Sequence, residues 1–459
     1  MGLFEEVGKN KNLVYVDDND HGREYFFNEL PFLKIEESKT KQLAFLYLDN
    51  SLQAVTVFWS YMRSNNALAL LSPNLSGDFK TELENLYKPH YIYDPTRAEI
   101  ENYDSSVNNG LNIHTFPVSH PTNINGKIKV LLSTSGTTGS PKFVKLSEEN
   151  LLANADSIID YLPIRKDDVT PLNLPVFYSY GLSILTTNSL VGGKVVCGGI
   201  DVLSRTFWPK MSSYGYTSIA GVPFVYEMLD RIGFRKSTYP SLRYFTVAGG
   251  KLEQSILKNF AEYAHNHNVS FFVMYGQTEA TARMSYLPPV KLLEKTGSIG
   301  IPIKNGVFEL EHETGELCYH GPNVFGGYVS EPADLATYEQ PGFLHTGDLA
   351  RVDADGYYYI MGRLKRFVKL FGNRVNLDEV EAIAATYSGS IVRCVGVNDK
   401  ALVMALTDNT IDANTLMSYV SEKTKIHHSV LKIVFMDEYP LSQNGKVDYN
   451  KIVDLHEAK

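Results

Sequence analysis

The 459-residue sequence predicts an α/β fold: a large domain of doubly wound, largely parallel sheets with a small β section, then a smaller α+β domain. Short apolar runs alternate with segments of helix length such as 52–61, which is the rhythm of parallel strands joined by crossover helices. The strand-like runs are 43–48, 67–71, 195–197, 218–222, 244–248 and 270–274.

The pattern changes twice in the second half of the chain. Between 297 and 360, closely spaced short strands are separated by Gly, Pro and Asn turns, which predicts the small β section. From about residue 366, helix and strand patterns mix over a length that suits a separate, lid-sized domain. We therefore expect a large domain over 1–364 and a small domain over 365–459.

A basic cluster lies near this expected boundary. Its members are Arg363, Lys365, Arg366, Lys369 and Arg374. Such a cluster is typical of an ordinary solvated surface as well as of a functional one, so the residues alone leave both interpretations open.

Composition excludes several classes of protein. Hydrophobic residues make up 44% of the chain and charged residues 21%, as in ordinary soluble globular proteins. The net charge of −9 argues against broad nucleic-acid binding, which needs a basic surface. The N-terminus does not resemble a signal peptide, and no apolar stretch is long enough to span a bilayer. Three widely spaced cysteines, without metal-ligand spacing, fit buried thiols in a reducing compartment. We expect a cytoplasmic enzyme with no nucleic-acid and no membrane partner.

The most informative segment is 133–142, Ser-Thr-Ser-Gly-Thr-Thr-Gly-Ser-Pro-Lys, which follows the apolar run 128–132. Its glycines allow backbone N–H groups to turn inward around an anion, and the hydroxyls and Lys142 add further donors, so we expect a phosphate-binding loop. It is not a Walker loop, because Pro141 interrupts the run from glycine to lysine. A helix is predicted after a short link, with Ser147 as its N-cap. The alternative is an ordinary surface connection.

A second polar segment, Tyr275-Gly276-Gln277-Thr278-Glu279, follows the apolar run 271–274. An aromatic ring, a glycine, a hydroxyl and a carboxylate at one strand end can together stack a base, bind a phosphate and hold a hard cation. The alternative is a polar turn with a partly buried tyrosine.

Two further motifs end in single charged residues. In His345-Thr346-Gly347-Asp348 the carboxylate suits a pair of ribose hydroxyls, and Arg363 lies fifteen residues beyond it. The alternative for Asp348 is a turn residue. In residues 443–448 the Asn-Gly pair predicts a tight hairpin turn, which would present Lys446 rigidly. An ordinary surface lysine is equally consistent with that turn.

In order and spacing, these motifs resemble the adenylate-forming superfamily: acyl- and aryl-CoA synthetases, peptide-synthetase adenylation domains and luciferases. The resemblance covers nearly the whole chain, from about Leu43 to Lys446. Besides the segments above it includes Gly249-Gly250, 297–300, Gly315-Glu316, Gly327-Tyr328, Gly362-Arg363, 369–372 and 444–446.

The resemblance implies a two-step reaction. A carboxylate and ATP, with Mg²⁺, would give an acyl-adenylate and pyrophosphate, and the acyl group would then pass to a thiol. The thiol would belong to CoA or to a carrier protein's phosphopantetheine, and the residues do not choose between them.

The resemblance also implies a role for each motif residue. The β- and γ-phosphates would be held by Ser133, Thr134, Ser135, Gly136, Thr137, Thr138, Gly139 and Lys142. Adenine would lie against Tyr275 and Gly276, beside Gly249 and Gly250. The remaining roles would be α-phosphate contact by Thr278, Mg²⁺ binding by Glu279, ribose binding by Asp348 and Arg363, and charge stabilisation by Lys446. In the small domain, Lys365 would be a hinge and Gly372 would line the thiol tunnel.

Residues 174–181 resemble the family segment that lines the acyl pocket. Tyr178 stands where amino-acid-activating members carry an Asp, and an unpaired ammonium in a dry pocket is costly, so an α-amino acid is disfavoured. The expected wall residues are Phe177, Tyr178, Val222, Val247 and Met274, although some of these are equally typical of an ordinary core. They suit a small aryl, alkyl or hydroxy acid.

Other functions remain open on the residues alone. The runner-up enzyme is an amino-acid-activating ligase for a carrier protein. A non-catalytic nucleotide-binding relative comes from a different class and is disfavoured by the joint presence of Lys446, Glu279, Asp348 and Arg363. A luciferase-like oxidase is a remote third.

Overall fold

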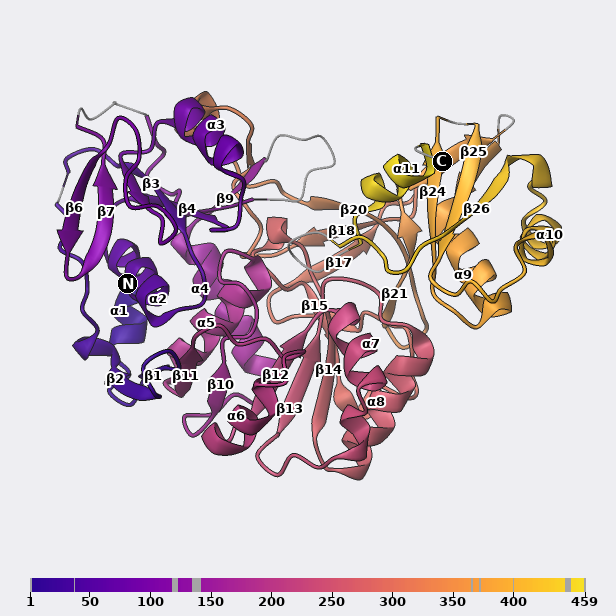
Figure 1. The fold of residues 1–459 in the computed structure, drawn as a ribbon, viewed down its shortest axis with the longest axis horizontal. Helices are drawn as coiled ribbons and strands as arrows, with labels where there is room; N and C mark the ends of the chain where they lie inside the picture. Colours follow the sequence, from indigo (N-terminus) through magenta and orange to yellow (C-terminus); the bar gives the residue numbers. More distant parts are fainter. Residues whose placement is uncertain are drawn as a thin grey trace.

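Six β-sheets form within the described residues of this computed structural model, which are 2–36, 38–117, 123–133, 142–364, 366–370, 373–398, 400–441 and 447–457 (Figure 1). The α/β class expected from the sequence is confirmed. No helix among these residues is long and apolar enough to cross a membrane. All three cysteines are buried and unpaired.

The largest sheet has eight strands in the order β19-β9-β8-β4-β3-β5-β7-β6. Its strands are β3 (Leu43–Tyr47), β4 (Ala67–Leu71), β5 (Tyr91–Tyr93), β6 (Asp104–Asn108), β7 (Leu111–Thr115), β8 (Val130–Ser133), β9 (Phe143–Leu146) and β19 (Tyr328–Val329). The central strands β5, β3, β4 and β8 are parallel, and α2 (Leu52–Arg63) and α3 (Gly77–Tyr87) connect them. Near-continuous apolar runs form these strands because both faces of the sheet are covered.

The second sheet has five strands in the order β12-β13-β14-β15-β16. Its strands are β12 (Ser218–Gly221), β13 (Tyr244–Val247), β14 (Ser270–Tyr275), β15 (Ser285–Leu287) and β16 (Ile301–Pro302). The first three run parallel and are joined by α7 (Pro223–Arg231) and α8 (Gln254–Asn266). The carboxyl ends of β13 and β14 therefore lie side by side, and the glycine and tyrosine motifs follow them directly.

A third sheet, β10-β11-β1-β2, joins segments far apart in sequence. It consists of β1 (Val14–Asp17), β2 (Arg23–Phe26), β10 (Val169–Pro171) and β11 (Lys194–Cys197), with α1 (Leu3–Gly8) preceding it and α6 (Phe207–Tyr214) following it along the chain.

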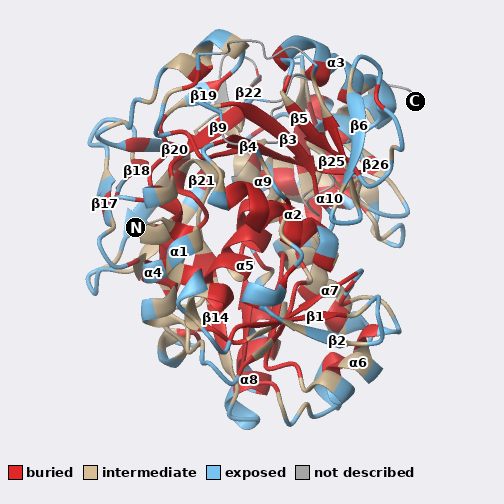
Figure 2. Cartoon of the chain, turned by 90° about the vertical axis from the view of Figure 1, so that its left-hand side faces the viewer, coloured by how far each residue is buried: buried red, intermediate tan, exposed pale blue. Residues whose placement is uncertain are grey.

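Two adjacent helices, α4 (Glu148–Tyr161) and α5 (Ser179–Val191), lie between the large sheets (Figure 1). Ser147 caps α4 as expected: its hydroxyl accepts from the Asn150 N–H at 3.1 Å. Helix α5 is buried along most of its length (Figure 2), because Leu182 packs against the eight-stranded sheet while Tyr180 packs against the five-stranded one.

The expected β section is a four-stranded antiparallel sheet in the order β17-β18-β20-β21. Its strands are β17 (Val307–Leu310), β18 (Glu316–His320), β20 (Leu344–Val352) and β21 (Tyr358–Arg363). Strand β20 is long enough to carry the Thr346-Gly347-Asp348 motif inside the sheet rather than in a turn, which excludes the turn interpretation of Asp348.

The C-terminal part has a core of its own. It consists of β22 (Phe367–Leu370), β23 (Asn373–Asn376), α9 (Leu377–Ser388), β24 (Val392–Val397), β25 (Ala401–Leu406), α10 (Ala413–Thr424), β26 (Leu431–Phe435) and α11 (Tyr449–Glu457). Its two buried clusters, as far as the described residues show, contain only side chains from residue 368 onward. The division into domains at 364/365 stays a prediction, which these separate cores support.

Candidate active site

Strand β14 ends in a cluster of donors around the carboxylate of Asp348. The Tyr275 hydroxyl donates to Oδ2 of Asp348 at 2.6 Å, and the Gln277 amide donates to the same oxygen at 3.3 Å. Arg363 lies opposite Asp348 across β20 and β21, with its Nε 3.0 Å from Oδ1. Asp348 is 2% exposed, whereas the Arg363 side chain is 60% exposed. A buried anion on β20 is thus held in place by two donors from the end of β14 and by an ion pair from β21.

The backbone next to Asp348 is fixed by Glu316 on the neighbouring strand. Oε1 of Glu316 accepts from the Gly347 N–H at 2.8 Å, and Oε2 is hydrogen-bonded to Nδ1 of His345 at 3.0 Å. The Thr346 hydroxyl accepts from the Asp348 N–H at 3.1 Å. Gly347 has a φ of +73°, a conformation that favours glycine, so the motif needs its glycine at this position. These contacts hold Asp348 in place on β20, where the end of β14 meets it.

The Tyr275 hydroxyl is kept as a hydrogen-bond donor by its raised pKa. Burial raises the pKa of its hydroxyl well above the usual value, and the charge of Asp348 raises it further. The hydroxyl therefore stays protonated and donates to the carboxylate at any physiological pH.

Two residues of this cluster were missed in the sequence. Gln277 lies inside the quoted motif and links it to β20 through bonds to the Thr346 carbonyl at 2.7 Å and to Asp348. Glu316 follows Gly315 in another quoted motif. The sequence did show both polar residues in or beside a motif, but the groups on β20 that they contact could be identified only from the sheet register.

Glu279 is positioned from the other side of the site. Its Oε1 accepts from the Tyr328 hydroxyl at 2.9 Å, and its carbonyl accepts from the Phe325 N–H at 2.8 Å. Glu279 and Thr278 lie in a short 3-10 turn at 278–280, directly after β14. The turn presents a hydroxyl and a carboxylate within one residue of each other, a combination that suits a hard cation and its anionic ligands.

Glycines allow the close backbone approaches at these strand ends. A Cβ on Gly276 would lie 1.9 Å from the Ala282 carbonyl oxygen, so no other residue fits without movement. Gly249, after β13, has a φ of +91°, and a Cβ on Gly250 would lie 3.3 Å from Cγ of Pro223. The backbone between β13 and β14 is therefore bare, as a flat ligand requires.

The hydroxyl-rich segment 133–142 begins at the end of strand β8. Ser133 ends β8 and pairs with Phe143, which starts β9, so two antiparallel neighbours flank the segment. Lys142 immediately precedes β9. The expected short link before α4 is thus itself a strand. The other expected phosphate-binding residues, Thr134, Ser135, Gly136, Thr137, Thr138 and Gly139, lie outside the described residues.

Three expected residues of the C-terminal part also lie outside the described residues: Lys365, Gly372 and Lys446. The flanking residues Leu441 and Val447 form an antiparallel bridge.

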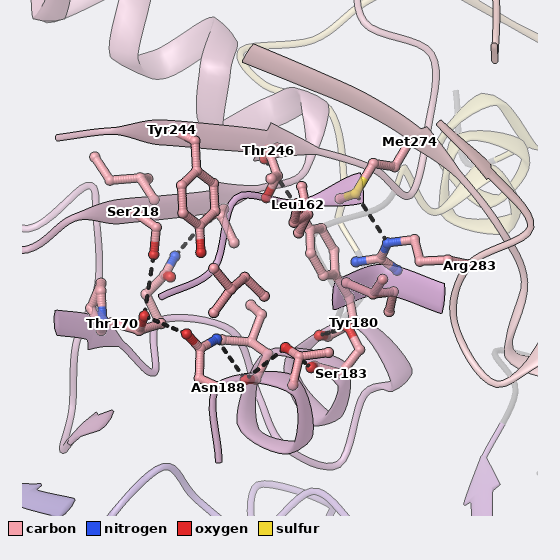
Figure 3. A pocket seen from close by; sticks show the side chains of 18 residues that line it. Leu162, Thr170, Tyr180, Ser183, Asn188, Ser218, Tyr244, Thr246, Met274 and Arg283 are labelled. Atoms are coloured by element: carbon pink, nitrogen blue, oxygen red, sulfur yellow. Dashed lines mark hydrogen bonds between the residues drawn. The ribbon is translucent and has the colours of Figure 1, made fainter. Parts of the chain in front are cut away.

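A narrow cavity of about 30 Å³ lies between the five-stranded sheet and α5 (Figure 3). Its lining combines apolar side chains with an arginine, two asparagines and several hydroxyls. The lining residues are Ile158, Leu162, Ile164, Thr170, Pro171, Asn173, Tyr180, Ser183, Ile184, Thr187, Asn188, Ser218, Ile219, Ala220, Tyr244, Thr246, Met274 and Arg283.

Only one of the expected wall residues lines this cavity, and that is Met274. Val247 instead packs into the core on the opposite face of β13, and the neighbouring Thr246 faces the cavity. Successive side chains of a strand point to opposite faces, so Thr246 rather than Val247 faces this cavity, and the expected wall residues stay a prediction. Phe177, Tyr178 and Val222 are at least partly buried outside the lining, the first two against core clusters.

One further group has the ligand types of a metal site. Atoms of Glu316, Cys318 and His345 lie within 4.8 Å of one another. Burial raises the pKa of the Cys318 thiol, and the charge of Glu316 raises it further, which opposes the thiolate that a metal would need. The bond from Glu316 to His345 accounts for this arrangement without an ion.

Comparisons with known proteins give consistent matches over most of the chain. The family model described as AMP-binding enzyme matches residues 37–329. The oxalate–CoA ligase of Arabidopsis thaliana is 30% identical over 349 residues, covering 71% of this chain and 67% of that protein. The 2-succinylbenzoate–CoA ligase of Bacillus mycoides is 28% identical over 336 residues, with 69% and 68% covered.

Solved structures extend the match in fold to the rest of the chain. The o-succinylbenzoate CoA synthetase of Bacillus subtilis in complex with AMP has a TM-score of 0.76 at 21% identity, covering 98% of both chains. A fatty acyl CoA synthetase of Mycobacterium tuberculosis has a TM-score of 0.71 at 17% identity, covering 100% of this chain and 98% of that one.

Proposed function

We propose that this chain, which belongs to the AMP-binding enzyme family, activates a carboxylic acid with ATP to an acyl-adenylate and then transfers the acyl group to a thiol. The resemblance inferred from the motifs is confirmed by the family match, and the relatives are CoA ligases, as expected for an acid–thiol ligase. The observation that carries the proposal is the buried carboxylate of Asp348 on β20. Tyr275, at the end of β14, donates a hydrogen bond to it, and Arg363 forms an ion pair with it.

This cluster fits the ribose and base of ATP. A carboxylate accepts from both ribose hydroxyls, and the exposed fork of Arg363 is free to move onto a sugar or phosphate oxygen. Tyr275 and the bare backbone of Gly249, Gly250 and Gly276 suit the flat base beside it. A second buried acid facing Arg363, or a bulky residue at the glycines, would have excluded this fit.

We assign the phosphates and the metal to the neighbouring segments. The segment 133–139 with Lys142 would hold the β- and γ-phosphates, Thr278 the α-phosphate and Glu279 the Mg²⁺ ion. A structure of the B. subtilis relative is described in complex with ATP and magnesium ion. Bound there, Mg²⁺ would neutralise phosphate charge.

No protein nucleophile is needed for this reaction. Two anions must be brought together, so positioning and positive charge would supply most of the rate. We assign the charge at the reacting oxygens to Lys446, which would bridge the acid's carboxylate and the α-phosphate.

For the acceptor we favour CoA, because the relatives' names describe CoA ligases, and a carrier protein's phosphopantetheine is the alternative. Lys365 would act as the hinge on which the small domain rotates between half-reactions, and Gly372 would then line the thiol tunnel. The names oxalate, feruloyl and 2-succinylbenzoate span different acids, so they do not identify this chain's substrate.

The decisive experiment measures pyrophosphate release with Mg-ATP over a panel of short diacids, alkyl, aryl, hydroxy and amino acids. Hydroxylamine traps the adenylate as a hydroxamate, and CoA or a phosphopantetheinylated carrier then replaces it to test the acceptor. Acid-dependent pyrophosphate and hydroxamate support the proposal. ATP binding without turnover for any acid would instead favour a nucleotide-binding relative that lacks catalysis.

A further inference from the structure

The cavity beneath the strand ends contains a buried guanidinium without an ionic partner. Arg283 is 3% exposed, its Nε donates to the Met274 sulfur at 3.4 Å, and its Nη1 donates to the Ala282 carbonyl at 3.2 Å. Its Cζ lies 3.9 Å from the centre of the Tyr180 ring (Figure 3). No carboxylate of a described residue forms an ion pair with Arg283.

Two other partly buried arginines each have an ionic partner. Arg243 pairs with Asp168 at 3.0 Å, and Arg97 pairs with Asp94 at 2.7 Å. A guanidinium cannot lose its proton to escape burial, and an uncompensated buried charge is costly. The missing partner of Arg283 therefore points to an anion that enters the cavity.

A second orphaned polar atom lines the same cavity. Oδ1 of Asn173 is buried and has no hydrogen-bond partner. Its Nδ2 donates to the Ala220 carbonyl at 2.6 Å, which fixes the orientation of the amide and leaves Oδ1 as an acceptor. A hydrocarbon chain would satisfy neither atom, so the cavity suits a polar ligand.

The size of the cavity limits that ligand. A cavity of about 150 Å³ can hold a benzene ring, whereas this one measures about 30 Å³. Any acid therefore has to displace part of the lining, and aryl and long alkyl acids require a large rearrangement of α5 or of Arg283 itself. A short acid requires the smallest displacement.

Arg283 lies close to the end of β14, where the acid would react. Met274 and Tyr275 are consecutive on β14 and point to opposite faces, Met274 into the cavity and Tyr275 toward Asp348. The two faces meet at Gly276, where a Cβ would lie 2.8 Å from Cα of Arg283. An acid that reacts at this strand end has the Arg283 side chain along its path.

We propose that the substrate is a short dicarboxylic acid whose second, non-reacting carboxylate is bound by Arg283. This rests on the adenylation function proposed above. The planar fork offers paired N–H groups that match a carboxylate, and the Tyr180 ring supports the opposite face of the guanidinium. Tyr180 is itself fixed, because its hydroxyl bonds to Oγ1 of Thr246 at 2.6 Å.

The test compares matched acids. Initial rates of hydroxamate formation are measured for diacids of two to five carbons and for monoacids of the same length, with wild type and Arg283→Leu. We expect wild type to favour the diacid, and Arg283→Leu to lower kcat/KM for the diacid by about 100-fold or more while leaving the monoacid equal or improved. The KM for ATP stays within about twofold, since Arg283 does not touch the Asp348 cluster. Arg283→Lys keeps the charge without the planar fork, so its kcat/KM for the diacid should lie between the values of wild type and Arg283→Leu.

Arg235→Leu is the matched control, since Arg235 pairs with Asp230 on the far side of α7. The diacid's stabilisation of each protein against thermal unfolding, in the presence of AMP, provides a readout independent of turnover. Wild-type preference for the monoacid, equal losses for both acid classes, or equal thermal stabilisation of wild type and Arg283→Leu would overturn the proposal. Adenylation of monoacids alone refutes this inference but not the function above. If no acid of either class is adenylated, the function fails and the thermal measurement still decides the Arg283 site.

Discussion

Asp348→Asn is the sharpest test of the nucleotide site, because it removes a charge and almost no volume. The carboxylate is 2% exposed, Tyr275 and Gln277 already donate to it, and Arg363 forms an ion pair with it. An Asn amide would turn one acceptor into a donor among these donors. A hydrogen bond to a charged group is worth about 1.5–3 kcal/mol and a neutral one about 0.5–1.5 kcal/mol.

Two ribose hydroxyls bound to the carboxylate would together contribute about 3–6 kcal/mol, of which the amide oxygen retains a part, so the net loss is about 2–4 kcal/mol. At 1.36 kcal/mol per factor of ten, ATP and AMP should bind about 30- to 1000-fold more weakly. Calorimetric titration with AMP measures this directly, at a temperature where thermal unfolding shows the variant to be folded.

Asp353→Asn is the matched control, since Asp353 lies in the turn of the same β20–β21 pair and its carboxylate pairs with Lys295 at 3.0 Å. Its AMP affinity should equal that of wild type. An Asp348→Asn protein that is folded and binds AMP within threefold of wild type would refute the assignment of Asp348 to the ribose.

Four further predictions address other parts of the site. Lys446→Ala should slow hydroxamate formation by at least about 100-fold while AMP titration stays near wild type, and near-normal adenylation would remove its catalytic role. Gly372→Leu should spare adenylation and block thioester formation, measured by replacing hydroxylamine with CoA, whereas equal loss in both half-reactions argues against a thiol tunnel. Glu279→Gln should raise the Mg²⁺ concentration for half-maximal rate several-fold, and an unchanged Mg²⁺ titration would place the metal elsewhere. Gly276→Ala should destabilise the fold by about 1–3 kcal/mol in urea unfolding, with Gly126→Ala, where a Cβ meets open space, as the neutral control.

The strand and helix rhythm could be predicted because buried parallel strands are short apolar runs with little ambiguity. Residues 67–71 and 43–47 form strands within one residue of the expected bounds. Strand β9 was missed because four residues between a Pro-Lys pair and a helix cap are too few to show a period. Its antiparallel pairing with β8 is a contact between two strands, which the local sequence of neither strand shows.

The donors around Asp348 were partly predictable. The strand-end motif named Tyr275, and the Thr-Gly-Asp motif named Asp348, but nothing local indicates that their side chains meet at 2.6 Å. The family resemblance assigned both residues to the nucleotide but did not predict their contact. The resemblance also included Gly315-Glu316 but gave Glu316 no role, and its role is to hold the backbone of another strand.

The lining of the cavity beside β13 and β14 could not be predicted, for a reason that follows from the strands themselves. In β13 and β14 both faces are buried, so apolar or small residues occupy every position and the alternation that normally separates core from site disappears. Val247 was therefore expected where Thr246 lies.

Arg283 indicates a ligand site only because no acid of a described residue pairs with it. That lack of a partner involves residues from distant segments, so it cannot be read from the linear sequence. Under the proposed function the same strand end would separate the two reactants, since Tyr275 points toward the Asp348 cluster and Met274 toward the cavity with Arg283. One consequence is separability: substitutions on the Met274 face should alter the choice of acid, and substitutions on the Tyr275 face should alter nucleotide affinity, with only Gly276 affecting both.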